Sequence, residues 1–216
     1  MLHAFRLAAV ICAVLPCAAL AHPHVFVDVS LTLRYDAQGR LAGIDEVWAY
    51  DELYSLLMLT EAGVEGTVDP GQMAALRGLD ANWDPLNGGR LTVEPPDGPA
   101  VLAQPRHLST QWQGNRMVTR RRHALSPPVA GDGPVFVRVY DPTYYVDFAM
   151  PSQVVIQGRA GCQASLQSGQ TRGQDDAYAA TLRAALAQEL DRAGPDDVQV
   201  DIGAVGADSI AVSCGR

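Results

Sequence analysis

Alternation of apolar and polar residues between positions 24 and 35 constrains the fold of this chain more than any other feature. Val25, Val27 and Val29 begin a series of apolar residues that continues at every second position to Tyr35. A period of two is typical of a β-strand with one buried face. Residues 36–40 have the composition of a turn, and residues 41–50 can return beside the first strand. The pattern predicts an antiparallel hairpin.

The register of this hairpin decides which distant residues meet. If Tyr35 pairs with Leu41, then His24 faces Glu52. Facing side chains lie about 5 Å apart, so the carboxylates of Asp51 and Glu52 are expected beside His24. A β-bulge would shift the register by one and exchange Asp51 for Glu52.

Helices and further strands follow the hairpin. Asp51 is predicted to cap a helix that ends near Gly63, a second short helix is expected over residues 69–79, and an amphipathic helix over 178–190. Strand-like segments recur at 101–113, 117–125, 135–140, 144–148, 154–157, 162–166, 198–202 and 210–214. The predicted fold class is α+β, with antiparallel, sandwich-like β-sheets and two or three packed helices.

Two regions are expected within the mature chain. Residues 22–90 form a region of hairpin and helices, and residues 91–216 form a mainly antiparallel β region with a C-terminal helix. A disulfide is expected to tie the last strand of the second region. The Gly- and Pro-rich stretch at 85–100 separates the two, and it also fits a long loop within one domain.

The first 21 residues resemble a cleavable secretory signal peptide. Arg6 precedes an apolar run over residues 7–20, and Ala19 and Ala21 supply the small residues of a cleavage site. The run is too short to span a bilayer comfortably, and Pro16 disfavours a lipid anchor at Cys17. We expect a soluble, periplasmic mature chain that begins at His22.

Charge narrows the classes of partner. The sequence carries a net charge of −8, which argues against nucleic acid and anionic membrane surfaces and favours cationic ligands. The basic run at residues 120–122 is too short to outweigh this acidity.

Cysteine usage predicts one disulfide. Cys12 and Cys17 leave with the signal, so Cys162 and Cys214 remain. In an oxidising compartment two such cysteines most simply pair, closing a loop of about 50 residues worth roughly 4 kcal/mol. A redox or metal-binding pair is less favoured because the Cys-x-x-Cys spacing is missing.

The expected new N-terminus, His22-Pro23-His24, is the strongest indication of chemistry. It offers an α-amine and two imidazoles, while Pro23 excludes the copper and nickel motif that needs a deprotonated second amide. A histidine brace and an imidazole site both remain possible. With Asp51 and Glu52 as further ligands, the donors suit zinc, nickel, cobalt or copper. The alternative is a frayed end beside carboxylates that only cap a helix.

The later histidines are weaker candidates. With a two-residue turn at 114–115, His107 opposes Arg122 and His123 opposes Arg106, which places the two imidazoles on opposite faces.

The Asp-Pro-Thr-Tyr-Tyr-Val-Asp segment at 141–147 is interpreted as a β-turn followed by a packed strand. No hydrolase elbow, phosphate-binding loop or dinucleotide fingerprint occurs.

Several motifs together resemble a known family. They are the His-Pro-His-Val-Phe-Val-Asp motif at 22–28, Trp-Ala-Tyr-Asp-Glu at 48–52 with Ser55, Tyr-Asp-Pro-Thr-Tyr-Tyr at 140–145, and the Cys162 and Cys214 pair. In order and spacing they resemble the bacterial domain-of-unknown-function family 1007, often described as an uncharacterised periplasmic component of an ABC-type transport system. The resemblance implies metal handling beside nickel/cobalt-type exporters or zinc-responsive genes. The His-rich loop of a metal sponge is missing here.

These observations lead to one leading hypothesis and two alternatives. The leading hypothesis is a periplasmic protein that binds a divalent transition metal through His22, His24, Asp51 and Glu52, and acts as accessory to a membrane cation transporter. The alternatives are a copper histidine-brace redox enzyme and a non-metal structural or adaptor domain of a transport system. Binding is favoured over catalysis because no substrate groove can be inferred from the sequence.

Overall fold

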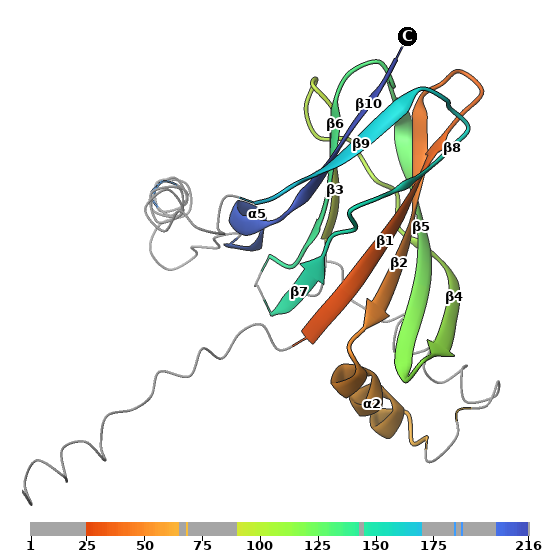
Figure 1. The fold of residues 1–216 in the computed structure, drawn as a ribbon, viewed down its shortest axis with the longest axis vertical. Coiled ribbons are helices and arrows are strands. Elements are labelled where there is room, and N and C mark those ends of the chain that lie inside the picture. The colour runs from red at the N-terminus through yellow and green to blue at the C-terminus, as the bar shows by residue number, and fades with distance from the viewer. Residues whose placement is uncertain are drawn as a thin grey trace, which may run out of the picture.

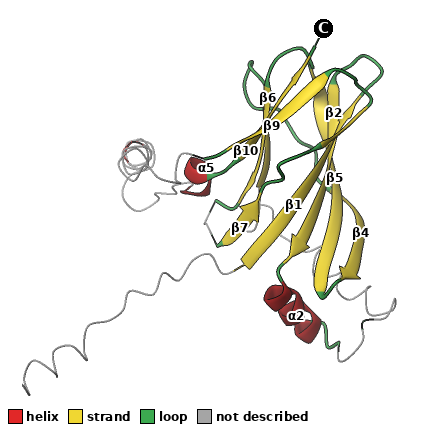
Figure 2. Cartoon of the chain, viewed as in Figure 1, coloured by secondary structure: helices red, strands yellow, loops and turns green. Residues whose placement is uncertain are grey.

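The architecture is a sandwich of two β-sheets with a helix at one end (Figures 1 and 2). It was determined as a computed structural model, which describes residues 25–64, 68, 90–142, 145–169, 184, 187 and 202–215. Between residues 25 and 64 the chain runs through β1 (Val25–Tyr35), β2 (Leu41–Tyr50) and helix α2 (Glu52–Glu61).

The six-stranded sheet has the order β4-β5-β2-β1-β7, with β8 also paired to β1. Its later strands are β4 (Arg106–Gln113), β5 (Arg116–Val129), β7 (Val146–Ala149) and β8 (Val155–Gln157). β1 runs antiparallel to β2 but parallel to β7 and β8. The expected all-antiparallel pairing is therefore wrong for β1, and the sheet joins strands from before and after the Pro-rich stretch at 85–100.

The four-stranded sheet has the order β3-β6-β10-β9. Its strands are β3 (Arg90–Glu94), β6 (Val135–Tyr140), β9 (Cys162–Gln167) and β10 (Ser209–Cys214), and the short helix α5 (Ile202–Gly206) precedes β10. Cys162 lies opposite Cys214 in the β9–β10 pair. The two sulfurs form a disulfide with a Cα–Cα distance of 3.9 Å, which confirms the predicted bridge.

The core lies between the sheets. Every second residue of β1 from Val25 to Tyr35 is buried, as are Val93, Val137 and Ile210 of the four-stranded sheet. Because the two apolar faces cover each other, neither needs a layer of helices.

The predicted α+β class with two or three packed helices is therefore wrong, whereas its sandwich-like sheets are confirmed. The described chain is mostly strand. The predicted helix after Asp51 exists as α2, but it lies at one end of the sandwich rather than across a sheet (Figure 1). The helix expected at 69–79 lies outside the described residues, as does the one at 178–190 except for Ala184 and Ala187. In the ranges described, no helix has the length and apolar character needed to cross a membrane.

A bulge changes the register of the first hairpin. Tyr35 pairs with Leu41 as expected, but Arg34 pairs with Gly43, so Ala42 is an extra residue in β2. A Cβ at Gly43 would lie 2.9 Å from the carbonyl oxygen of His123 in β5, so glycine permits this close approach. The predicted register from Arg34 back toward His24 is wrong by one residue.

Candidate functional site

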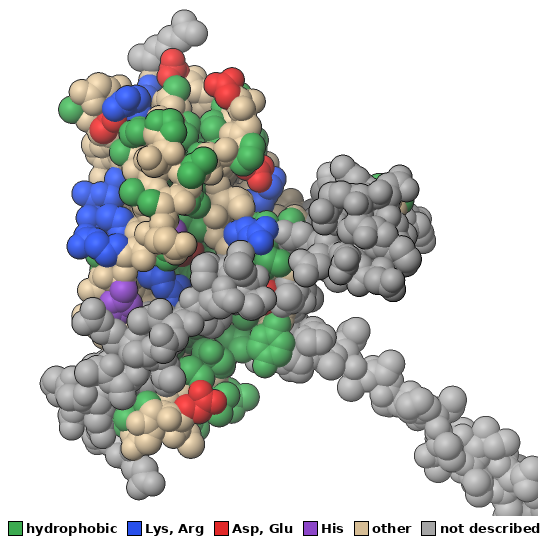
Figure 3. Space-filling model, turned by 180° about the vertical axis from the view of Figure 1, so that it is seen from behind, with side chains coloured by type: hydrophobic (Ala, Val, Ile, Leu, Met, Phe, Trp, Pro, Cys, Tyr) green, Lys and Arg blue, Asp and Glu red, His purple; other side chains and the backbone are tan. Residues whose placement is uncertain are grey.

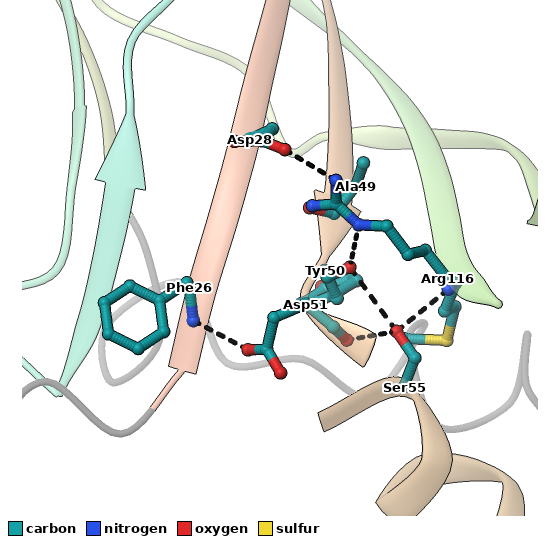
Figure 4. A network of polar contacts seen from close by, with 8 residues as sticks. Phe26, Asp28, Ala49, Tyr50, Asp51, Ser55 and Arg116 are labelled. Carbon is teal, nitrogen blue, oxygen red and sulfur yellow. Dashed lines mark hydrogen bonds and ion pairs between the residues drawn. The ribbon is translucent and has the colours of Figure 1, made fainter. Parts of the chain in front are cut away.

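Asp51 joins β1, β2 and α2 at one end of the sandwich (Figure 4). One carboxylate oxygen, Oδ1, accepts the N–H of Tyr54 at 2.8 Å and caps the helix. The other, Oδ2, accepts the N–H of Phe26 at 2.8 Å, while the N–H of Asp51 donates to the Phe26 carbonyl at 2.8 Å. The bulge-shifted register makes this possible, because it brings Asp51 opposite Phe26 at the start of β1.

A second set of contacts fixes the same junction. Ser55 is fully buried, and its hydroxyl donates to the Asp51 carbonyl at 2.6 Å and accepts the N–H of Met117 at 2.9 Å. Arg116 donates to the carbonyl of Tyr50 at 2.5 Å and pairs with Asp28 at 2.6 Å (Figure 4). The end of β2 is thus held by β5 as well as by β1.

Sequence reasoning missed the role of Arg116. This residue follows the 114–115 turn, and no periodicity distinguishes it from other polar positions of β5. The position of Asp28 gave a weak indication of this ion pair, because Asp28 lies on the outward face of β1, where a charged side chain can pair with one on a neighbouring strand.

The predicted metal ligands fall into two groups. His22 and His24 lie outside the described residues. Asp51 and Glu52 are adjacent, but Asp51 already accepts two backbone N–H groups, which leaves about two of the four acceptor positions of a carboxylate. Glu52 is exposed in the first turn of α2 and makes no hydrogen bond or ion pair with other described residues. Across the ranges described, no group of three His, Cys, Asp or Glu side chains could hold a metal ion.

The two histidines of β4 and β5 do not have the predicted partners. A second irregularity, between His107 and Ser109, pairs His107 with Arg121 and Arg106 with Arg122. His107 and His123 therefore lie on the same face of the sheet, since Arg121 and His123 are two residues apart. The predicted opposite placement is wrong because the bulge adds one residue to β4.

A buried polar cluster on this face was not predicted. His123 Nε2 lies 3.0 Å from Glu46 Oε2, and Glu46 is 2 % exposed. The Arg121 guanidinium is buried 4.2 Å from the centroid of the Trp48 ring. Glu46 Oε1 and Thr119 Oγ1 have no hydrogen-bond partner among the described residues. Glu46 lies at the same alternate positions of β2 as the buried Ile44 and Trp48. This pattern in the sequence could have predicted that Glu46 faces inward.

Strand geometry divides the basic run at 120–122 between two faces. Arg121 points inward, while Arg122 forms a two-pronged pair with Asp45 on the outer face. The hydrogen bond and charge of Arg122 lower the pKa of Asp45 below its ordinary value of 3.8. Seen from behind, arginine side chains form one larger group at the left edge of the molecule and smaller groups elsewhere on that face (Figure 3).

In the part that the structure describes, the Asp-Pro turn at 141 has a structural role. Asp141 is buried, and its Oδ2 accepts the N–H groups of Tyr145 and Val146, each at 2.9 Å. These bonds position the start of β7, while Thr143 and Tyr144 lie outside the described residues.

Comparisons with known proteins place the chain in a family. A search of curated proteins finds no match. Among solved structures, the chain is similar to the acetylcholine-binding protein type 1 of Biomphalaria glabrata, with 12 % identity over 97 % of both chains and a TM-score of 0.35. At that score nothing further is inferred from the likeness. A family model described as "Protein of unknown function (DUF1007)" matches residues 7–214. The chain belongs to the DUF1007 family.

Proposed function

We propose that this chain is a periplasmic binding protein for a divalent transition metal, such as zinc, nickel, cobalt or copper, and an accessory to a membrane cation transporter. The ligands in this proposal are His22, His24, Asp51 and Glu52, and Asp51 keeps about two acceptor positions besides its two backbone hydrogen bonds. The observation that carries it is the reciprocal pairing of Phe26 with Asp51. Because His24 precedes Phe26 by two residues and Glu52 follows Asp51 directly, this pairing supports a site that draws its ligands from both segments.

Calorimetric titration of protein that begins at His22 tests the metal site. We expect about one site of sub-micromolar affinity, and loss of at least about tenfold in affinity for His24→Ala and for Glu52→Gln. Glu61→Gln is the matched control, because it removes an exposed charge at the other end of α2. No binding of any of the four metals would overturn the proposal.

Addition of one residue before His22 separates two kinds of site. A site made of imidazoles and a carboxylate keeps its affinity, whereas a copper histidine brace requires the free α-amine and loses it. Mass spectrometry of native periplasmic protein tests export at the same time, since it reports both the N-terminus and the bound metal.

Helix α2 supports the transporter part of the proposal. Leu53, Leu56 and Leu57 are 78 %, 58 % and 49 % exposed beside the proposed site, and such neighbouring apolar side chains are typical of protein contacts. A photo-crosslinker at position 56 is expected to capture a membrane transport protein in cells, whereas one at Gln38 is not. Capture of membrane transport proteins equally from both positions, or from neither, would contradict this part.

A further inference from the structure

A cavity of about 570 Å³, largely open to solvent, lies at the end of the sandwich opposite α2. Its walls come from the β1–β2 turn at residues 38–40, the loop at 130–132 before β6, and the segments around Arg159 and Gly215. In Figure 1 this turn lies at the upper end of the molecule and α2 at the lower end. The volume is within the range of about 300–1,000 Å³ that is usual for small-molecule sites.

Arg159 presents an oriented positive charge to this cavity. Its Nη1 donates to the Gly39 carbonyl at 2.5 Å, its Nη2 donates to the Gly215 carbonyl at 3.0 Å, and its guanidinium lies 5.8 Å from the centroid of the Tyr35 ring. These partners are neutral, and no carboxylate in the described part of the chain pairs with Arg159. A guanidinium has five N–H donors, so three have no partner among the described residues.

Asp132 presents the opposite charge. This residue also lines the cavity, is exposed, and makes no hydrogen bond or ion pair with other described residues. Arg40, the other cation of the lining, is already paired with Asp36 at 2.7 Å. Among the described residues, the cavity therefore holds one positive and one negative group that no opposite charge compensates.

Backbone glycines keep the cavity walls close to Arg159. A Cβ at Gly131 would lie 2.0 Å from Arg159 Nη1 and 2.3 Å from the Gly39 carbonyl oxygen. Any larger residue would displace the guanidinium, so glycine is required for this arrangement.

We propose that this cavity binds a small zwitterion of the amino-acid class. The carboxylate of the ligand pairs with Arg159 in a charge-assisted hydrogen bond, and its ammonium group pairs with Asp132. The proposal does not depend on the proposed metal site, whose described residues Asp51 and Glu52 lie at the other end of the molecule (Figure 1).

A series of four-carbon ligands tests this site by NMR titration of amide shifts. The probes are 2-aminobutanoate and 4-aminobutanoate, which carry both charges at two spacings, and butanoate and butylamine, which carry one charge each. At least one zwitterion is expected to bind about tenfold or more tightly than both single-charge probes, with the largest shifts at Gly39 and Gly131. Zwitterions that bind no better than butanoate and butylamine would overturn the proposal.

Substitutions test whether Asp132 and Arg159 supply the two charges that the ligand contacts. Asp132→Asn is expected to reduce the affinity of the zwitterion to that of butanoate, and Glu61→Gln at the opposite end is expected to leave it unchanged. Arg159→Lys is expected to weaken the binding of the zwitterion and of butanoate alike, because a point charge does not reproduce the planar fork. Since Arg159 also holds the turn, a variant that fails to fold leaves the ligand series and Asp132→Asn to decide. Unchanged zwitterion affinity in Asp132→Asn would contradict the proposal.

Discussion

Asp51 satisfies backbone groups of two different elements with one carboxylate. Its oxygens accept the N–H of Tyr54 in α2 and the N–H of Phe26 in β1. Asp51→Ala removes a helix cap and leaves the Phe26 amide without its partner, so the free energy of unfolding is expected to fall by about 2 kcal/mol. Urea denaturation measures this loss. Glu52→Gln, in the next residue, is the control, with a change within about 0.5 kcal/mol; equal effects of the two substitutions would contradict the assigned role.

Asp45 links stability to pH through its ion pairs. Its pKa is lowered mainly by the hydrogen bond from Arg122, so the folded chain releases this proton at lower pH than the unfolded chain, whose aspartates titrate near 3.9. The contribution is present above about pH 4 and is lost as the pH falls through the lower pKa of the folded state. For a partly exposed pair it amounts to about 1 kcal/mol.

The difference in melting temperature between wild type and Asp45→Asn tests this linkage. We expect a constant difference from pH 7 to about pH 5 and a shrinking one below about pH 4. Asp97→Asn serves as the control, because Asp97 is exposed and has no partner among the described residues. A difference in melting temperature that grows toward low pH would show that the predicted direction of the pH dependence is wrong.

At the scale of elements, the disulfide secures strand β9. β9 lies at the edge of the four-stranded sheet, beside β10, and Cys162 and Cys214 pair at one end of the two strands. Replacement of both by serine releases a cross-link between residues 52 apart and is expected to lower the free energy of unfolding by about 4 kcal/mol in the chain-entropy model. Because the cross-link acts on the unfolded chain, amides that exchange by global unfolding should lose protection alike in both sheets, and β9 at the sheet edge should show an additional loss from local opening. A loss below about 1 kcal/mol, or amides of β9 that lose no more protection than those of β6, would contradict this assignment.

At the scale of the whole molecule, the buried face of the six-stranded sheet combines an apolar core with a polar cluster. His123→Leu removes the hydrogen bond to Glu46 Oε2 and leaves a buried carboxylate whose other oxygen already has no partner among the described residues. The free energy of unfolding is expected to fall by about 2–3 kcal/mol in urea denaturation. His107→Leu is the matched control, since His107 is half-buried on the outer strand β4 and contacts a neutral Thr110 hydroxyl; its expected cost is about 1 kcal/mol or less. Equal costs for the two histidines would argue against the cluster.

Local patterns in the sequence determined the elements of residues 25–64 and the disulfide. Alternation identified β1 and β2, and Asp51 before an apolar run identified the cap of α2. The pairing of Cys162 with Cys214 followed from the prediction that Cys12 and Cys17 are removed with a signal peptide. Each of these properties depends on near neighbours in the chain or on residue chemistry alone.

Only the tertiary structure decided how these elements meet. The extra residues at Ala42 and near Leu108 shift two registers by one, and a shift of one moves every pairing between strands. These shifts bring Asp51 opposite Phe26 and place His107 and His123 on one face. β1 also pairs in parallel with β7 and β8, which begin more than 100 residues later in the chain. Alternation shows which face of a strand is buried but not which strand lies beside it, because that choice depends on the packing of the whole sandwich.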